Sequence, residues 1–257
     1  MLSRLALVLG LCASAFAQGI TVAAAADMSA VLPEIAARYK SHAGQEVKLI
    51  FGSSGNLTTQ IRNGAPFDIF FSADEEYPKQ LIDAGLAEKD TLYCYAIGRL
   101  ALWVPNDSPL DLSKAGMQAL LDPTVRKVAI ANPQHAPYGR AAEAVLRHFG
   151  IYDQISAKLV LGENVSQAVQ FVESGNAQAG LIALSHALAP AMRAKGRYWT
   201  VPLDAYPTLN QAVVVLSRSK QQQAARKFLE FVHSPEATSL LKSYGFSLAS
   251  QKFVEKP

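Results

Sequence analysis

A glycine- and serine-rich turn, Gly52-Ser53-Ser54-Gly55, lies between a strand-like run and an amphipathic run. Backbone N–H groups at the start of a helix, together with small hydroxyls, can hold an anion without a cationic side chain. The same residues also suit an ordinary helix N-cap with a flexible turn. The turn alone leaves both interpretations open.

Three further positions have the same arrangement of a strand, a turn of small residues and a helix. They are Ala26-Asp27, Pro137-Tyr138-Gly139 and Asn164-Val165. In open α/β sheets, ligands bind beyond the carboxyl ends of the strands, where helix N-termini converge. Two junctions belong to the start of the chain and two to its middle. We therefore expect one site in a cleft between two domains.

The elements that position these junctions follow from hydrophobic periodicity. Residues 20–72 predict a β-α-β-α-β series with parallel strands, and residues 127–183 repeat the scheme. Two long β runs, 93–104 and 211–216, predict crossings between domains. The expected fold is α/β, with two Rossmann-like lobes, mixed but mainly parallel sheets, and the second lobe inserted in the first. The expected bounds are 18–97 with 212–257 for lobe I, and 98–211 for lobe II.

Residues 1–17 have the pattern of a secretory signal peptide. Arg4 is the only charge, a short apolar run follows, and Ala15-Phe16-Ala17 offers a small-x-small cleavage site. The apolar run is too short to span a bilayer. Cleavage near Ala17 would leave Cys94 as the only cysteine, so no internal disulfide is expected. This combination favours a protein exported to a bacterial periplasm.

Charge and motif content argue against several function classes. The chain has 24 Lys and Arg against 21 Asp and Glu, scattered without the basic stripe of a nucleic-acid-binding protein. It has no G-x-S-x-G elbow, Walker loop, dinucleotide fingerprint or zinc-ligand spacing, and its five histidines suggest no triad. We expect no enzymatic activity and no cofactor. A periplasmic hydrolase that uses Ser53 or Ser54 is kept as an alternative.

Four sequence blocks together resemble the molybdate-binding periplasmic proteins of ABC importers. The blocks are Ala24-Ala25-Ala26-Asp27-Met28, residues 51–57, residues 64–74 and residues 132–139. The resemblance covers essentially all of the chain after the signal peptide. It implies a type II periplasmic-binding-protein fold whose lobes close on tetrahedral molybdate or tungstate. It also implies a monomer that delivers the anion to an inner-membrane permease. A receptor for sulfate, phosphonate or a ferric complex is the alternative, as is a signalling or scaffold protein on the same fold.

The resemblance also implies ligand-binding positions. Ser54 corresponds to the side-chain donor, Tyr138 and Val165 to backbone donors, and Ala26 with Asp27 to the first junction. Neighbouring candidates with weaker support are Ser53, Met28 and Ser29. Molybdenum would be held as its oxyanion, without direct protein–metal bonds. Two positions depart from the familiar pattern, because Asp27 replaces a serine and Ala183 replaces a tyrosine.

Asp27 requires a physical explanation, because molybdate is a dianion that only accepts hydrogen bonds. We expect the Asp27 side chain to cap its own helix, while its N–H or that of Met28 faces the anion. The alternative is a protonated Asp27 that donates to the oxyanion.

Overall fold

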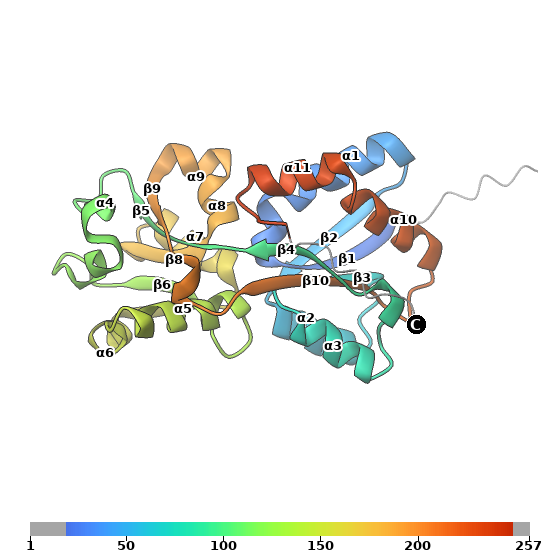
Figure 1. The fold of residues 1–257 in the computed structure, drawn as a ribbon, viewed down its shortest axis with the longest axis horizontal. Helices are drawn as coiled ribbons and strands as arrows, with labels where there is room; N and C mark the ends of the chain where they lie inside the picture. The colour runs from blue at the N-terminus through green and yellow to red at the C-terminus, as the bar shows by residue number, and fades with distance from the viewer. Residues whose placement is uncertain (1–18, 249–257) are drawn as a thin grey trace, which may run out of the picture.

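The computed structural model describes residues 19–248, so the predicted signal peptide, residues 1–17, lies outside the described residues. The described chain forms two five-stranded sheets flanked by helices (Figure 1). The first sheet and its helices are called the first lobe, and the second sheet and its helices the second lobe. No helix within residues 19–248 is both long and apolar enough to cross a bilayer.

The first sheet has the order β2-β1-β3-β10-β4. Strand β1 pairs in parallel with β2 and β3, and β10 pairs antiparallel with β3 and β4. The strands are β1 (Ile20–Ala25), β2 (Val47–Gly52), β3 (Ile69–Ser72), β4 (Tyr93–Gly98) and β10 (Leu209–Val215).

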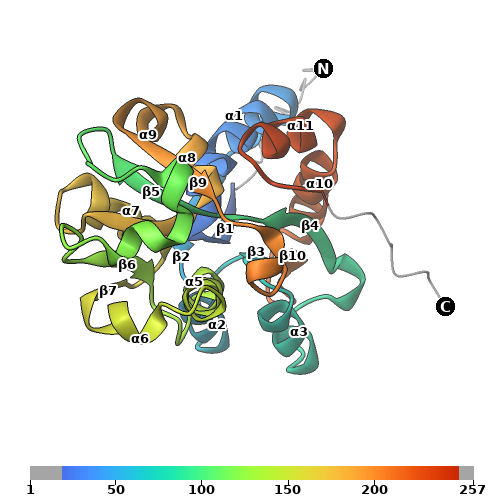
Figure 2. The same ribbon diagram turned by 60° about the vertical axis from the view of Figure 1, so that its left-hand side comes forward.

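Alternate residues of these strands face two separate apolar clusters, as the two-residue period of a strand requires. Phe71 packs with α1 (Leu32–Ala43), α10 (Gln222–Val232) and α11 (Pro235–Ser243), which lie together on one face (Figures 1 and 2). Phe70 packs on the opposite face with α2 (Ser54–Arg62) and α3 (Glu76–Asp83). The first sheet is therefore buried on both sides, which explains its nearly continuous apolar strands.

The second sheet has the order β7-β6-β8-β5-β9. Strand β6 is parallel to β7 and β8, and β5 is antiparallel to β8 and β9. The strands are β5 (Leu100–Pro105), β6 (Val128–Ala131), β7 (Leu159–Gly162), β8 (Ala179–Ala183) and β9 (Gly196–Thr200). The helices are α4 (Leu112–Ala115), α5 (Pro137–His148), α6 (Tyr152–Ile155), α7 (Val165–Glu173), α8 (Leu184–Leu188) and α9 (Pro190–Lys195).

The chain passes between the sheets twice. The long β run predicted over 93–104 is two strands, β4 in the first sheet and β5 in the second, separated only by Arg99. The chain returns between β9 and β10, so the second sheet is inserted between two strands of the first. The predicted α/β class with an inserted second lobe is thus confirmed.

Close packing at the first crossing requires glycine. A Cβ at Gly98 would lie 2.4 Å from the Tyr138 hydroxyl and 2.5 Å from Nε2 of Gln211. Both distances are far below van der Waals contact, so a larger residue would push these two side chains apart. Gly98 thereby lets polar groups of α5 and β10 meet beside the crossing.

Candidate functional site

Residues from all four predicted junctions line one small pocket between the two lobes. Its walls are Ala25, Ala26, Asp27, Gly52, Ser53, Ser54, Ala73, Ala136, Pro137, Tyr138, Asn164 and Val165. The first seven belong to the first lobe and the last five to the second. The structure therefore brings together Ser54, Asp27, Ala26, Tyr138, Val165 and Ser53 of the predicted site.

Ser54 is the first residue of α2 and is fully buried. Its Oγ accepts a hydrogen bond of 3.0 Å from the backbone N–H of Ala73. A serine hydroxyl has one proton to donate as well as lone pairs to accept. No residue between 19 and 248 accepts that proton, so the Ser54 hydroxyl is oriented by Ala73 and free to donate into the pocket.

Ser53 occupies the N-cap position of α2, yet its side chain makes no cap hydrogen bond. Its Oγ instead lies 2.9 Å from Nδ1 of His135 in the second lobe. Two residues further along, Gly55 donates its backbone N–H to the His135 carbonyl at 2.9 Å. A Cβ on Gly55 would lie 2.7 Å from the Tyr77 hydroxyl and 2.8 Å from that carbonyl. The start of α2 thus contacts the second lobe directly, and Gly55 permits the approach.

The predicted capping role of Asp27 is wrong. The residues after β1 form a 3₁₀ helix, Ala26–Ala30, whose N-cap is Ala25 and which has no side-chain cap hydrogen bond. The Asp27 carboxyl is fully buried, and its Oδ2 accepts a hydrogen bond of 2.6 Å from Nε2 of Gln211 on β10. The long-range partner overrides the local N-cap preference, because a buried carboxyl needs a strong donor.

Asp27 belongs to a buried polar network. Nε2 of Gln211 also donates to the Tyr138 hydroxyl at 3.1 Å, and the Tyr95 hydroxyl donates to Oε1 of Gln211 at 2.8 Å. The second carboxyl oxygen of Asp27, Oδ1, is buried without a hydrogen-bond partner. Burial raises the pKa of Asp27 to about 7, although the Gln211 amide, the backbone of Asp27 and the Tyr138 hydroxyl act in the opposite direction.

Tyr138 and Val165 lie in the first turns of α5 and α7. The first N–H groups of an α-helix have no partner within the helix. Asn164, the N-cap of α7, accepts a hydrogen bond through its side chain from the Gln167 N–H at 3.1 Å, so α7 is fixed by a conventional cap. The Tyr138 hydroxyl accepts a hydrogen bond from Gln211. The backbone N–H of Tyr138, rather than its phenol, is therefore the group available to a ligand.

Met28 and Ser29 are absent from the lining of this pocket. Met28 is fully buried in the apolar cluster of the first lobe. Ser29 faces the second lobe, where its Oγ lies 3.0 Å from Nε2 of His186 and 3.1 Å from Oγ of Ser166. Ser166 also donates to the Ala26 carbonyl at 3.0 Å.

His186 was missed in the sequence analysis. It lies on α8, directly after β8, and burial lowers its pKa to about 4. Its neighbour Ser185 donates to the Asp27 backbone carbonyl at 2.8 Å. The sequence could have indicated this position, because the strand–helix junction at Ala183 has the same arrangement as the other four.

The positive charge that follows the Pro137-Tyr138-Gly139 junction, Arg140, is paired within the protein. Nη2 of Arg140, on the first turns of α5, lies 2.6 Å from Oδ2 of Asp74, in the loop after β3. Burial raises the pKa of Asp74, an effect that the Arg140 charge partly offsets. Within residues 19–248, no group of three or more His, Cys, Asp or Glu is placed to hold a metal ion.

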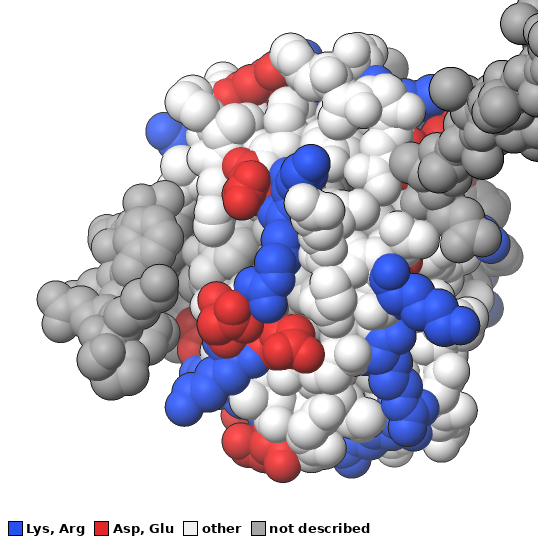
Figure 3. All heavy atoms as spheres, turned by 90° about the vertical axis from the view of Figure 1, so that its right-hand side faces the viewer, with Lys and Arg blue, Asp and Glu red and all other residues white. Residues whose placement is uncertain are grey.

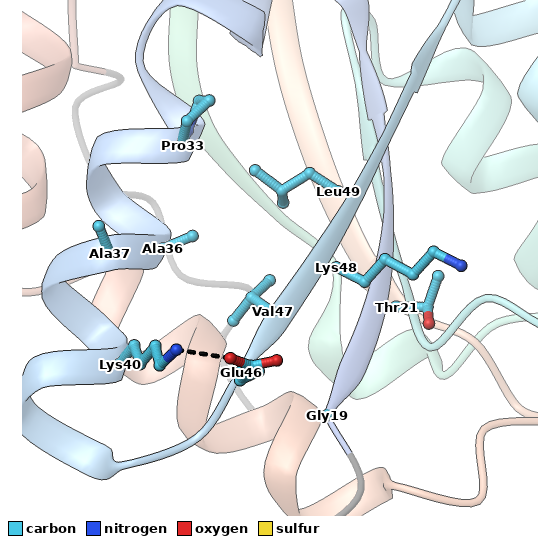
Figure 4. Close-up of a pocket in the computed structure, with 10 residues that line it drawn as sticks. All are labelled: Gly19, Thr21, Pro33, Ala36, Ala37, Lys40, Glu46, Val47, Lys48 and Leu49. Atoms are coloured by element: carbon cyan, nitrogen blue, oxygen red, sulfur yellow. Dashed lines mark hydrogen bonds and ion pairs between the residues drawn. The ribbon is translucent and has the colours of Figure 1, made fainter.

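A larger open hollow lies elsewhere, between α1 and the edge strand β2 (Figure 4). Lys40 and Glu46 form an ion pair across it, and the Lys48 side chain extends away from that pair. The end of the first lobe carries both signs of charge rather than a basic patch (Figure 3). The hollow is lined by residues of the first lobe alone, so it is not a site between the two lobes.

Comparisons with known proteins agree with this geometry. The chain is 37% identical over 244 residues to the molybdate-binding protein ModA of Rhodobacter capsulatus, covering 95% of this chain and 94% of the relative. It is 36% identical over 250 residues to the protein of the same name from Azotobacter vinelandii, covering 96% and 98%. The solved structure of the periplasmic molybdate-binding protein of A. vinelandii superposes with a TM-score of 0.84 at 33% identity, covering 90% of this chain and 99% of that one.

The family model described as bacterial extracellular solute-binding protein matches residues 20–247, nearly all of the described chain. Its match spans both sheets and all four junctions that line the pocket. The chain belongs to the bacterial extracellular solute-binding protein family.

Proposed function

We propose that this protein is a periplasmic receptor that captures molybdate, and also tungstate, between its lobes and delivers the anion to an ABC importer. The observation that carries the proposal is the convergence of the starts of α2, α5 and α7 with the turn after β1 on one buried pocket. Relatives with 36–37% identity over most of the chain are named for molybdate binding, which supports this ligand over others.

In this proposal, neutral donors replace the hydration shell of the anion. The Ser54 hydroxyl and the backbone N–H groups of Tyr138 and Val165 supply hydrogen bonds, and helix N-termini favour negative charge. The turn at Ala26 and Asp27 forms the remaining wall. Molybdenum is held through its oxygens, with no direct bond to the protein and no cofactor.

Lobe closure completes the site. We propose that lobe I comprises residues 18–97 and 212–257, that lobe II comprises residues 98–211, and that they close about the two crossings. Hydrogen bonds between the lobes, such as Gly55 N–H to the His135 carbonyl and Asn56 to Glu163, support a closed form. Because the pocket lining contains no Lys or Arg among residues 19–248, affinity should depend only weakly on salt.

Titration calorimetry with molybdate, tungstate and sulfate tests the ligand assignment. We expect tight binding of molybdate and tungstate and much weaker binding of sulfate, because a smaller anion leaves the donors too far from its oxygens. Equal affinity for sulfate would overturn the choice of ligand. A second check is the melting temperature, which a tight ligand must raise.

Export, partner and assembly are part of the same proposal. Signal peptidase would cleave near Ala17, the mature protein would act as a monomer in the periplasm, and an inner-membrane permease would receive the anion. Mass spectrometry of the exported protein should give an N-terminus close to Gln18. Light scattering of the purified protein should give the mass of one chain.

The hydrolase alternative has one observation in its favour, the 2.9 Å contact between Ser53 Oγ and His135 Nδ1. A serine nucleophile needs a histidine base that a third group orients. Within residues 19–248, no acidic side chain hydrogen-bonds to His135. We therefore expect no labelling of the folded protein by a fluorophosphonate probe, and covalent labelling of Ser53 or Ser54 would favour the hydrolase.

A further inference from the structure

We propose that the carboxyl of Asp27 acts as a neutral hydrogen-bond donor to the bound oxyanion, so that the protein takes up one proton with each anion. This inference rests on the proposed oxyanion-binding function and adds a chemical role for one residue. The Asp27 carboxylate takes one proton from solvent when one dianion binds. The product is a protonated carboxyl that is hydrogen-bonded to the dianion. No bond within the anion breaks.

The geometry assigns the proton to one oxygen. Oδ2 of Asp27 already accepts an N–H from Gln211 at 2.6 Å, so it faces a donor. The Gln211 amide is oriented by its other contacts, since its Nε2 also meets the Tyr138 hydroxyl and its Oε1 accepts from Tyr95. Oδ1 is buried and has no protein partner. A proton on Oδ1 therefore needs an acceptor from outside the protein.

The position of Asp27 supplies that acceptor. Asp27 lines the interlobe pocket together with Ser54, Tyr138 and Val165. An anion held by those residues presents oxygens that only accept hydrogen bonds. A protonated Oδ1 satisfies both groups at once, whereas an ionised Asp27 would leave a buried anionic oxygen beside a dianion.

In the described part of the chain, no Lys or Arg forms an ion pair with Asp27 or lines the pocket beside it. None of the ion pairs among residues 19–248 includes Asp27, and Arg140 is paired with Asp74. Burial already raises the pKa of Asp27 to about 7 before any anion is present. A bound dianion raises that pKa further, because a nearby negative charge disfavours the ionised form.

The other titratable groups around Asp27 keep one form near neutral pH. Tyr138 from α5 and Tyr95 from β4 have pKa values raised by burial well above the usual value for tyrosine. On α8, burial lowers the pKa of His186 to about 4, so its imidazole is neutral. His135, whose Nδ1 lies 2.9 Å from Oγ of Ser53 at the pocket, is the remaining titratable group. Proton uptake between about pH 6 and about pH 9 that is lost in Asp27→Asn is therefore assigned to Asp27.

Titration calorimetry with molybdate, repeated in two buffers of different ionisation enthalpy, measures the proton uptake directly. We expect uptake to approach one proton per molybdate at about pH 9 and to diminish toward about pH 6. The association constant should fall by up to about tenfold per pH unit above the pKa of the free carboxyl.

The variant Asp27→Asn keeps the shape of the side chain and an N–H donor but carries no titratable proton. We expect it to bind molybdate with no proton uptake and an affinity that is flat with pH. Asp83→Asn is the matched control, because it removes a carboxyl from the exposed surface of α3, outside the pocket lining. Asp83→Asn should retain the proton uptake of the natural protein.

Three results separate the possible failures. Tight molybdate binding without proton uptake by the natural protein overturns the role of Asp27 but leaves the proposed function intact. Uptake that persists in Asp27→Asn also overturns it. No molybdate binding at any pH overturns the proposed function and this inference with it. If Asp27→Asn does not fold, the infrared C=O band of a carboxylic acid, present in the loaded natural protein at about pH 8, decides the question.

Discussion

Arg140 and Asp74 form an ion pair across the cleft, with 2.6 Å between Nη2 and Oδ2. The Arg140 guanidinium also lies over the Tyr77 ring, 5.7 Å from its centroid. The arginine beside the pocket is therefore engaged with the first lobe, where it supports closure instead of pairing with a ligand.

The variant Arg140→Gln tests this role. We expect molybdate affinity to fall by about fivefold, because a partly exposed ion pair contributes about 1 kcal/mol. Arg147→Gln, which removes an exposed ion pair with Glu143 on the same helix, is the control and should bind normally. A loss of more than a hundredfold in Arg140→Gln would instead indicate direct contact between the guanidinium and the anion.

Ser54→Ala should weaken molybdate binding by about 10- to 100-fold, because a hydrogen bond to a charged ligand contributes about 1.5–3 kcal/mol. The substitution also removes the acceptor for the Ala73 N–H, so a small loss of stability is expected. Calorimetry gives the affinity and circular dichroism the fold. Thr59→Ala, on the exposed side of the same helix, should leave binding unchanged. Unchanged affinity in Ser54→Ala would remove this hydroxyl from the site.

Gly55→Ala should prevent full closure. The added Cβ would lie within 3 Å of the Tyr77 hydroxyl and the His135 carbonyl, so the lobes must move apart. Small-angle scattering should then show no contraction on adding molybdate, and affinity should fall. Asn56→Ala removes the exposed contact with Glu163 without adding volume and should still contract. Normal contraction in Gly55→Ala would show that this approach is not required for closure.

His186 should make the ligand-free protein less stable in acid. Its pKa is about 4 in the folded chain, below the ordinary value of 6.5. The unfolded chain therefore binds the extra proton first, and stability falls as the pH drops from about 6.5 to about 4. The loss amounts to roughly 3 kcal/mol.

Denaturant unfolding of the natural protein and of His186→Gln, compared across this pH range, measures the contribution of the imidazole. The difference in the free energy of unfolding between the two proteins should be largest near neutral pH. It should shrink or change sign in acid. His148→Gln, at an exposed position, should run parallel to the natural protein. Parallel curves for His186→Gln as well would contradict the assignment.

Much of the architecture was visible in the sequence, because local periodicity determines it. The buried run that contains Phe70 and Phe71 predicted a buried parallel strand, and small residues after four strands marked the junctions that meet at the pocket. Strand β9 was missed because its half-exposed residues form no apolar run. The short helices α8 and α9 were missed because Pro190 interrupts the periodicity.

The contacts inside the site depend on partners that are remote in sequence. Asp27 followed by a helical pattern predicts a cap, yet its hydrogen-bond donor, Gln211, lies 184 positions away. Ser53 similarly meets His135 across 82 positions. Local rules assign such residues to the nearest backbone group, and only the assembled fold shows the competing donor.

The discontinuity of the first sheet has a consequence for how the chain acquires its structure. Strand β10 lies between β3 and β4, and the first sheet therefore stays in two pieces until Leu209–Val215 has been synthesised. The second sheet is formed entirely by residues 100–200 and is complete earlier. During synthesis from the N-terminus, the second sheet can thus fold before the first. Strands β1 to β4 are made early, but their sheet is completed only when β10 is available.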